Sequence, residues 1–293
     1  FFEPLPINCN KVTNATMGES NHGLHASELF GVKGKVALVT GGSRGIGLMM
    51  ARGLVANGAI VFISARKRSE CEKTAAALTS MGPGKCYSLP ADLSSDAACR
   101  QLATQLAQHT DRLDILVNNA GATWGADFEE FPEEAWSKIM TLNVTSVFNL
   151  TRACLKLLEA ASGGKDSPSR VINISSVMGH STDPTENTYS YGASKAALSH
   201  LTRVLAAQLT PRGITVNAIA PGVFPSKMTA YMFEGGDTPQ VVVDKHPIGR
   251  VGKEADMAGA VVFLCSPAGA FVSGTVLPMD GGYLIGKVGS PKL

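Results

Sequence analysis

The chain has 293 residues, 44% of them hydrophobic and 17% charged, and a formal net charge of +2. This composition is sufficient for a large core, which argues against a disordered chain, and the weak, scattered positive charge argues against nucleic acid as a partner. No apolar run reaches the ~18 residues that cross a bilayer, so we expect no membrane span.

Residues 1–33 are polar and have no hydrophobic period, so we interpret them as an irregular N-terminal extension outside the fold. They lack the charged and apolar regions of a secretory signal. The six cysteines are scattered without zinc-ligand spacing, which favours unpaired thiols in a reducing compartment and no metal site. We therefore expect a cytoplasmic protein; the C-terminal Pro291, Lys292 and Leu293 are a weaker indication of a peroxisomal address.

From Lys35 onward, short runs rich in Val, Ile and Leu alternate with longer stretches of helical spacing. Strands are predicted at residues 35–40, 59–64, 85–89, 114–118, 170–175, 214–219 and 275–279. Helices are predicted between them, most clearly at 46–56, 94–108 with Ser94 as N-cap, 133–160 and 190–209. Such apolar strands indicate a parallel sheet buried on both faces. We predict one α/β domain over residues 34–293, a Rossmann-type doubly wound sheet in a three-layer α/β/α sandwich.

The first strand is followed by a glycine-rich segment, 40–47, that opens the first helix. Gly41 permits a tight turn, Gly45 lets the backbone approach a pyrophosphate, and Gly47 allows the helix to pack closely on the sheet. The helix N-terminus supplies N–H groups for phosphate. A glycine loop alone can be a simple turn, but this position between strand and helix indicates a dinucleotide site that also includes Ser43, Arg44 and Ile46.

The second predicted strand ends without the acidic residue that would bind the ribose 2′-hydroxyl of NAD. Arg66 follows instead, and Arg44 in the glycine loop adds a second guanidinium group. Both suit bidentate contact with a 2′-phosphate, so we predict NADP(H) as the cofactor. The alternative is that Arg66 merely faces solvent.

Tyr191 and Lys195 lie four residues apart in a predicted helix and therefore share one face. A free tyrosine has a pKa of about 10, which is too high for proton exchange near neutrality. A neighbouring ammonium group favours the phenolate, so Tyr191 could act as general acid for carbonyl reduction and as general base for alcohol oxidation. The spacing alone is common by chance.

Two further polar residues strengthen this interpretation. Ser176 follows a predicted strand, 15 residues before Tyr191, where its hydroxyl could bind a substrate oxygen. Asn143 lies within the predicted helix 133–160, an unfavourable position for Asn, and could hold a water that relays protons to Lys195.

With these residues, the chain over 34–286 resembles the short-chain dehydrogenase/reductase family. The matching motifs are the glycine loop, Asn118-Asn119-Ala120-Gly121, Asn143, Ser176 followed by Val-x-Gly, Tyr191-x-x-x-Lys195 and Pro221-Gly222. The Val-x-Gly sequence favours Ser176 over Ser175. The resemblance implies a catalytic tetrad of Asn143, Ser176, Tyr191 and Lys195.

The resemblance also implies cofactor contacts along the same edge. Asp92 and Leu93 would border the adenine, Asn119, Ala120 and Gly121 would line the cofactor, and Tyr191 and Lys195 would hold the nicotinamide ribose. Pro221, Gly222 and Val223 would face the nicotinamide. Ser226 stands where the family usually has a threonine for the carboxamide. The spacing from Ser176 to Tyr191 is longer than usual in the family, which predicts an enlarged loop at 180–188.

Segments 114–121, 124–126, 142–148 and 224–229 are similar to those of β-ketoacyl reductases within the family. Apolar residues in the expected lid, 223–252, and after the fourth strand suit a hydrophobic ketone such as a 3-oxoacyl thioester, unless they pack the lid or a subunit interface. The resemblance implies a homo-oligomer, a tetramer or a dimer. Two alternatives remain: a polyol or sugar-acid dehydrogenase of the same family, and a catalytically silent NADP-binding sensor or scaffold.

Overall fold

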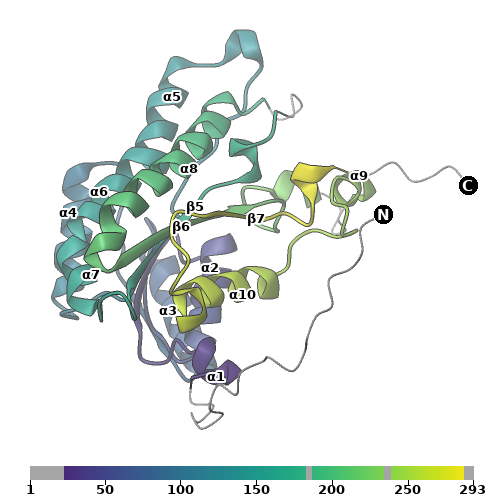
Figure 1. The fold of residues 1–293 in the computed structure, drawn as a ribbon. Coiled ribbons are helices and arrows are strands. Elements are labelled where there is room, and N and C mark those ends of the chain that lie inside the picture. The colour runs from purple at the N-terminus through teal and green to yellow at the C-terminus, as the bar shows by residue number, and fades with distance from the viewer. Residues whose placement is uncertain (1–22, 183–186, 234–238, 287–293) are drawn as a thin grey trace, which may run out of the picture.

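The computed structural model describes residues 23–182, 187–233 and 239–286. Within these ranges the strands form one parallel sheet of seven in the order β3-β2-β1-β4-β5-β6-β7 (Figure 1). The strands are β1 (Val36–Thr40), β2 (Ile60–Ser64), β3 (Lys85–Ser88), β4 (Ile115–Asn118), β5 (Ser169–Ile174), β6 (Ile214–Pro221) and β7 (Val276–Met279). Each predicted strand is confirmed to within two residues. Because strand order reverses direction between β1 and β4, the crevice that binds ligands in such sheets lies at their carboxyl ends.

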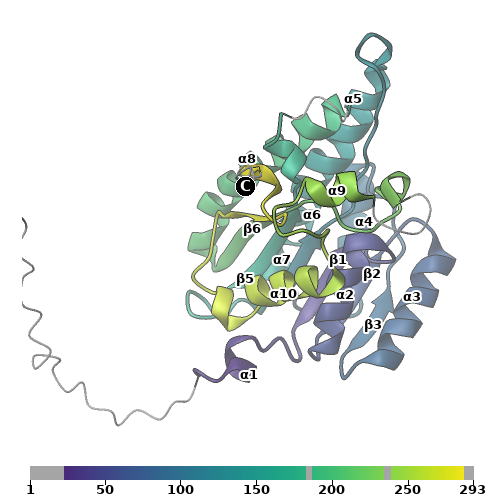
Figure 2. The ribbon, with the colours of Figure 1, turned by 90° about the vertical axis from the view of Figure 1, so that its right-hand side faces the viewer.

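Helices cover both faces of the sheet, which confirms the predicted three-layer architecture (Figures 1 and 2). One layer contains α2 (Gly45–Ala56), α3 (Arg68–Met81) and α10 (Glu254–Cys265). The other contains α4 (Asp96–Ala107), α6 (Ser146–Ala153), α7 (Leu155–Ala161) and α8 (Tyr189–Leu209), with α5 (Glu133–Met140) beside α8. The shorter helices are α1 (Ala26–Leu29) and α9 (Gln240–Asp244).

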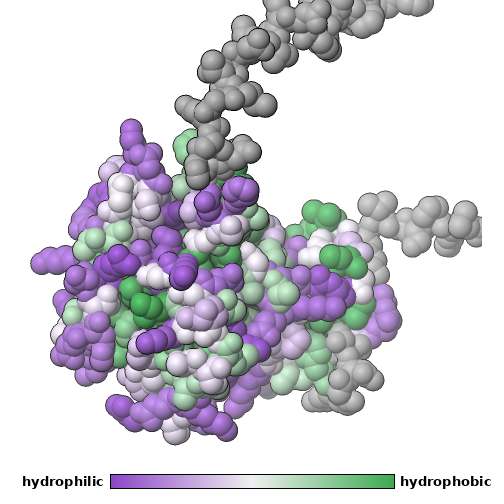
Figure 3. Space-filling view, turned by 90° about the horizontal axis from the view of Figure 1, so that it is seen from below, coloured by the Kyte–Doolittle hydropathy of each residue, from purple (hydrophilic) through white to green (hydrophobic). Residues whose placement is uncertain are grey.

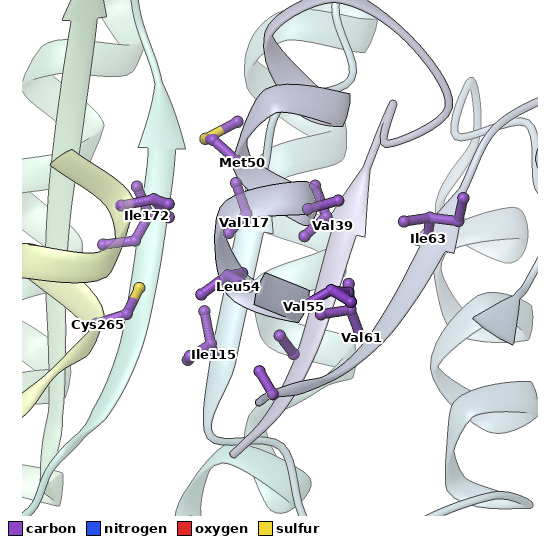
Figure 4. Packing of buried hydrophobic residues seen from close by; sticks show 14 of the residues in the cluster. Val39, Met50, Leu54, Val55, Val61, Ile63, Ile115, Val117, Ile172 and Cys265 are labelled. Carbon is purple, nitrogen blue, oxygen red and sulfur yellow. The ribbon is translucent and has the colours of Figure 1, made fainter. Parts of the chain in front are cut away.

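Alternate residues along each strand enter two separate hydrophobic clusters. On β1, Ala37 and Val39 pack with α2, whereas Val36 and Leu38 pack with the opposite helix layer. Figure 4 shows side chains from α2 lying over neighbouring strands in the first cluster. This alternation follows from the period of two in a β-strand, and it explains why the strands read as continuous apolar runs.

The predicted helix 133–160 is interrupted twice. A π-helical turn, η3 (Thr141–Thr145), joins α5 to α6, and Cys154 separates α6 from α7. The predicted N-cap Ser94 is wrong by one residue: Ser95 caps α4, since its hydroxyl accepts a hydrogen bond from the Ala98 amide at 3.2 Å.

In the described part of the predicted N-terminal extension, residues 23–33, the structure places the short helix α1, which the polar sequence did not indicate. Residues 1–22 of that extension, part of the predicted loop 180–188 and the C-terminal residues 287–293 lie outside the described residues. Among the described helices, none is long and apolar enough to cross a membrane. On the face seen in Figure 3, hydrophilic residues separate the hydrophobic ones into small patches.

Candidate active site

Hydrogen bonds tie the carboxyl ends of β1 and β4 together at the switch point of the sheet. The Thr40 hydroxyl accepts from the backbone amides of Asn119 and Ala120, each at 2.9 Å. The Asn119 side chain donates in return to the Thr40 carbonyl at 2.7 Å. These contacts fix the floor of the predicted cofactor site. Thr40 is a positioning residue that the sequence analysis did not single out.

The glycine loop has the backbone geometry of a phosphate cradle. Gly41 and Gly45 adopt φ values of +65° and +54°, which other residues rarely accept. The loop leads into α2, whose N-cap residue, Arg44, makes no side-chain capping hydrogen bond. The first amides of α2 are therefore not capped by that side chain, and together with the helix dipole they fit a pyrophosphate. Ser43 and Ile46 lie within this turn.

Gly47 holds the loop against the end of β4. A Cβ atom at this position would overlap the Gly41 carbonyl oxygen and the Asn119 side-chain nitrogen. We expect Gly47→Ala to displace the loop and weaken NADPH binding by at least about tenfold, a loss of ~1.4 kcal/mol. Fluorescence titration with NADPH measures this. Gly259→Ala is the control, since Gly259 is exposed on α10, has no positive φ and leaves no atom within 4 Å of the added Cβ. Equal affinities in the two variants would contradict the assignment.

Positive charge gathers beside the cradle. Arg44 and Arg66 are exposed, and no ion pair connects either to a carboxylate within the described part of the chain. The neighbouring Lys67 is instead paired with Glu70 at 2.9 Å. These two guanidinium groups, Arg44 in the glycine loop and Arg66 after β2, fit the predicted 2′-phosphate contact.

The residues predicted to border the adenine follow β3. Leu93 is buried in the core, whereas Asp92 is exposed and its carboxylate accepts a hydrogen bond from the Ser94 amide at 3.2 Å. Asp92 thereby stabilises the turn into α4. Its contact with an adenine stays a prediction.

Asn143 lies in the π-helical turn η3 and is almost fully buried. Its amide nitrogen donates to the Ala122 carbonyl at 3.0 Å and to the Ser194 hydroxyl at 2.9 Å, and its amide oxygen accepts from the Ala122 backbone at 2.9 Å. These bonds clamp the segment after β4 to α8, and π-helical turns often mark functional sites. The predicted water relay through Asn143 stays a prediction.

Lys195 is buried beside this clamp. Its ammonium group donates to the Ile174 carbonyl at 2.7 Å and lies 5.5 Å from the centre of the Tyr191 ring. Burial lowers the pKa of Lys195 to about 8. A Cβ on Gly121 would lie 3.7 Å from the Lys195 nitrogen and 3.1 Å from the Asn143 oxygen. Gly121 therefore leaves open the space between these two side chains.

Ser176 and Ser175 have different roles although they are adjacent. Ser176 starts the short 3₁₀ helix η4 (Val177–Gly179), and its oxygen accepts from the Met178 amide at 3.1 Å. That bond uses one lone pair and leaves the hydroxyl hydrogen for a substrate oxygen. The Ser175 hydroxyl is buried and donates to the Lys195 carbonyl. The choice of Ser176 agrees with this difference.

The segment after β6 closes the other side of the crevice. Pro221 ends the strand, Gly222 donates to the Met279 carbonyl at 3.0 Å, and the Val223 carbonyl accepts from Gly252 at 2.9 Å. Ser226 lies over the glycine loop, since a Cβ on Gly45 would be 3.2 Å from the Ser226 Cβ. Ser226, the predicted carboxamide contact, thus faces the glycine loop.

The structure therefore brings the predicted tetrad and cofactor residues to one edge of the sheet, where they follow the strands β1 to β6 or lie on η3 and α8. Ser194 and the Ile174 carbonyl were not predicted to take part. Ser194 lies three residues after Tyr191 in the same helix, and this spacing could have indicated that both residues face the site. A backbone carbonyl leaves no signal in a sequence.

Known proteins match most of this chain. A family model described as enoyl-(acyl carrier protein) reductase matches residues 41–284. The rhamnolipids biosynthesis 3-oxoacyl-[acyl-carrier-protein] reductase of Pseudomonas aeruginosa is 48% identical over 254 residues, which cover 87% of this chain and 98% of that protein. The galactitol 2-dehydrogenase (L-tagatose-forming) of Cereibacter sphaeroides is 34% identical over 257 residues, 88% of this chain and 98% of that protein.

Among solved structures, the Pseudomonas aeruginosa RhlG/NADP active-site complex matches with a TM-score of 0.84 at 47% identity, covering 88% of this chain and 99% of that one. The resemblance predicted from the motifs is confirmed by these matches over most of the chain. The chain belongs to the short-chain dehydrogenase/reductase family.

Proposed function

We propose that this protein is an NADPH-dependent carbonyl reductase, with Tyr191 as the proton donor to the carbonyl oxygen. The observation that carries the proposal is the position of the Lys195 ammonium group, buried and 5.5 Å from the Tyr191 ring, next to Asn143 and the open space at Gly121. A decayed, silent site would be expected to have lost a tetrad residue, and the sequence retains all four.

The chain's own residues supply orientation and proton transfer, whereas bound NADPH supplies the hydride. The Ser176 hydroxyl would bind the carbonyl oxygen and stabilise negative charge as it develops there. Tyr191 would donate its phenolic proton to the same oxygen. The Lys195 ammonium group favours the resulting phenolate. Holding carbonyl, hydride and phenol in one geometry accounts for much of the rate gain.

Arg44 and Arg66 are the residues that would favour NADPH over NADH. We expect Arg66→Asp to weaken NADPH binding about 100-fold, because it removes one charge-assisted contact to the 2′-phosphate and places a like charge there. NADH affinity should be unchanged or higher, since a carboxylate can accept from the 2′-hydroxyl. Fluorescence titrations with both cofactors measure the ratio, with Arg68→Asp on the exposed start of α3 as control. An NADPH/NADH ratio equal to that of the wild type would overturn this assignment.

We propose a hydrophobic ketone, with a 3-oxoacyl thioester as first candidate. Exposed apolar residues line the segments on both sides of the crevice: Met228 and Tyr231 after β6, and Phe128 after β4. Three relatives carry names of 3-oxoacyl-[acyl-carrier-protein] reductases. One relative at 34% identity is named as a galactitol 2-dehydrogenase. The substrate test therefore includes substrates of a polyol dehydrogenase.

A substrate panel distinguishes these alternatives. We would follow NADPH oxidation with 3-oxoacyl thioesters of increasing chain length and with a set of ketoses. We expect kcat/KM to rise with acyl chain length, by roughly 2–4-fold per CH₂ group, because burying each CH₂ contributes ~0.8 kcal/mol. Turnover of ketoses alone would support the alternative of a polyol or sugar-acid dehydrogenase. Tight NADPH binding without any turnover would favour the sensor or scaffold.

We also propose a homo-oligomer, a tetramer or a dimer. The support is a set of exposed apolar side chains on α5, α6 and α8: Trp136, Phe148 and Val204, each at least 40% exposed. Residues 34–293 would form the NADP-binding domain, with 1–33 outside it. The cytoplasmic location remains a proposal; the five cysteines among the described residues are free and buried, as suits structural thiols.

A further inference from the structure

A short chain of side-chain hydrogen bonds connects the surface to the backbone of the catalytic lysine. The Ser175 hydroxyl donates to the Lys195 carbonyl at 3.0 Å and lies 2.8 Å from the Ser199 hydroxyl. The Ser199 hydroxyl in turn lies 3.2 Å from Nε2 of His180. Ser175 and Ser199 are buried, whereas His180 is exposed. None of these three residues belongs to the tetrad.

The direction of this chain follows from counting hydrogens. The Lys195 carbonyl can only accept a hydrogen bond, so Ser175 donates its one hydroxyl hydrogen to it. Ser199 must then donate to Ser175, which leaves Ser199 with lone pairs only. His180 therefore carries a hydrogen on Nε2 and donates it to Ser199. Both the neutral Nε2–H tautomer and the imidazolium ion satisfy this requirement.

The same turn is held against α8 at a second point. Gly179 lies so close to α8 that an added Cβ would be 2.7 Å from the Ala196 nitrogen and from the Lys195 carbonyl carbon. Ser176 begins this turn and His180 ends it, and the His180 amide donates to the Val177 carbonyl at 2.8 Å. Close packing sets how near the turn lies to α8. The hydrogen-bond chain adds a directional restraint, because it joins the end of β5 and the end of the turn to one helix.

We propose that His180 is a positioning residue, which acts through Ser199 and Ser175 to hold the Ser176 turn in register with Tyr191 and Lys195 on α8. The required group at position 180 is an N–H donor, whether neutral or charged. Positioning matters because small displacements of a group that binds the reacting oxygen cost large factors in rate.

The test compares His180→Gln, which keeps an N–H donor on a side chain of similar reach, with His180→Met, which has similar bulk and no donor. Both changes are at an exposed position, so the fold is expected to persist in each. We expect kcat for a ketone that the wild type reduces to fall about tenfold in His180→Met and by less than about threefold in His180→Gln. The dissociation constant of NADPH should stay within about twofold in both, because the cofactor cradle is separate.

A double-variant cycle and an exchange experiment complete the design. Ser199→Ala should match His180→Met, and the double variant should be no slower than either single one, because all three break one chain. Hydrogen exchange of the amides in 178–181 should be faster in His180→Met than in the wild type or His180→Gln. Wild-type behaviour of His180→Met, equal losses in Gln and Met, or multiplicative effects with Ser199→Ala would overturn the proposal.

The inference builds on the proposed reductase activity, but the two can fail separately. If the wild type reduces no ketone, the proposed function fails. The exchange comparison then still decides whether His180 restrains the turn, since it needs no substrate.

Discussion

Tyr191→Phe is expected to lower kcat for ketone reduction by about 1000-fold, within the 10²–10⁴ range of general acid catalysis. The change removes one hydroxyl group and keeps the ring, so the ring's contact with the Lys195 ammonium group should persist. The change also leaves the buried side chains of α8 in place. The loss should therefore appear in kcat, with little change in the melting temperature.

The control for this variant is a second tyrosine on the same helix. Tyr189 begins α8, is 37% exposed and contacts Phe128 and Phe131, so Tyr189→Phe keeps its ring contacts. We expect kcat in Tyr189→Phe to stay within about threefold of the wild type. NADPH titration of both variants separates chemistry from binding. Reduction by Tyr191→Phe at more than a tenth of the wild-type rate would remove Tyr191 from the role of proton donor.

Lys195→Met is expected to abolish measurable reduction and to change how stability depends on pH. The activity is lost because no ammonium group remains to favour the Tyr191 phenolate. The stability effect follows from burial, which lowers the pKa of Lys195 to about 8 from the ordinary value near 10.4. Between about pH 8 and pH 10 the unfolded chain binds a proton at Lys195 that the folded chain has released.

The free energy of unfolding of the wild type should therefore rise with pH between about pH 8 and pH 10, relative to that of Lys195→Met. Below pH 8 the contribution of Lys195 to stability is least favourable. The gain is at most about 3 kcal/mol. Urea unfolding of both proteins at pH 7, 8, 9 and 10 measures the difference in the free energy of unfolding. Buried cysteines such as Cys154, whose pKa burial raises to about 12, affect both proteins equally and cancel. A difference that does not change with pH would contradict the lowered pKa of the buried Lys195 ammonium group.

The fold followed from patterns that are local in sequence. Strands buried on both faces are continuous apolar runs, and their limits were predicted to within two residues. The breaks in the predicted helix 133–160 were not predictable, because helical spacing continues through the π turn at Thr141–Thr145 and through Cys154. The N-cap was misplaced because Ser94 and Ser95 are chemically identical, and only the backbone decides which hydroxyl reaches the Ala98 amide.

The site was predictable where its chemistry depends on side chains at fixed spacing. Tyr191, Lys195, Ser176 and Asn143 were each selected before the structure placed them on one edge. The partners of Asn143 were not predictable, because Ala122 contributes backbone groups and Ser194 belongs to a helix distant in sequence. The same holds for the Ile174 carbonyl beside Lys195, since every residue carries a carbonyl and only the fold selects one.

The most direct test of the reductase assignment is hydride transfer itself. NADPH carrying deuterium at both C4 positions of the nicotinamide would be incubated with the wild-type enzyme and a long-chain 3-oxoacyl thioester, and the product examined by mass spectrometry and NMR. We predict one deuterium on the new alcohol carbon of the wild-type product, and formation of that product about 1000-fold more slowly by Tyr191→Phe. Bound NADPH with no deuterium in any ketone-derived product, from thioesters or ketoses, would contradict it.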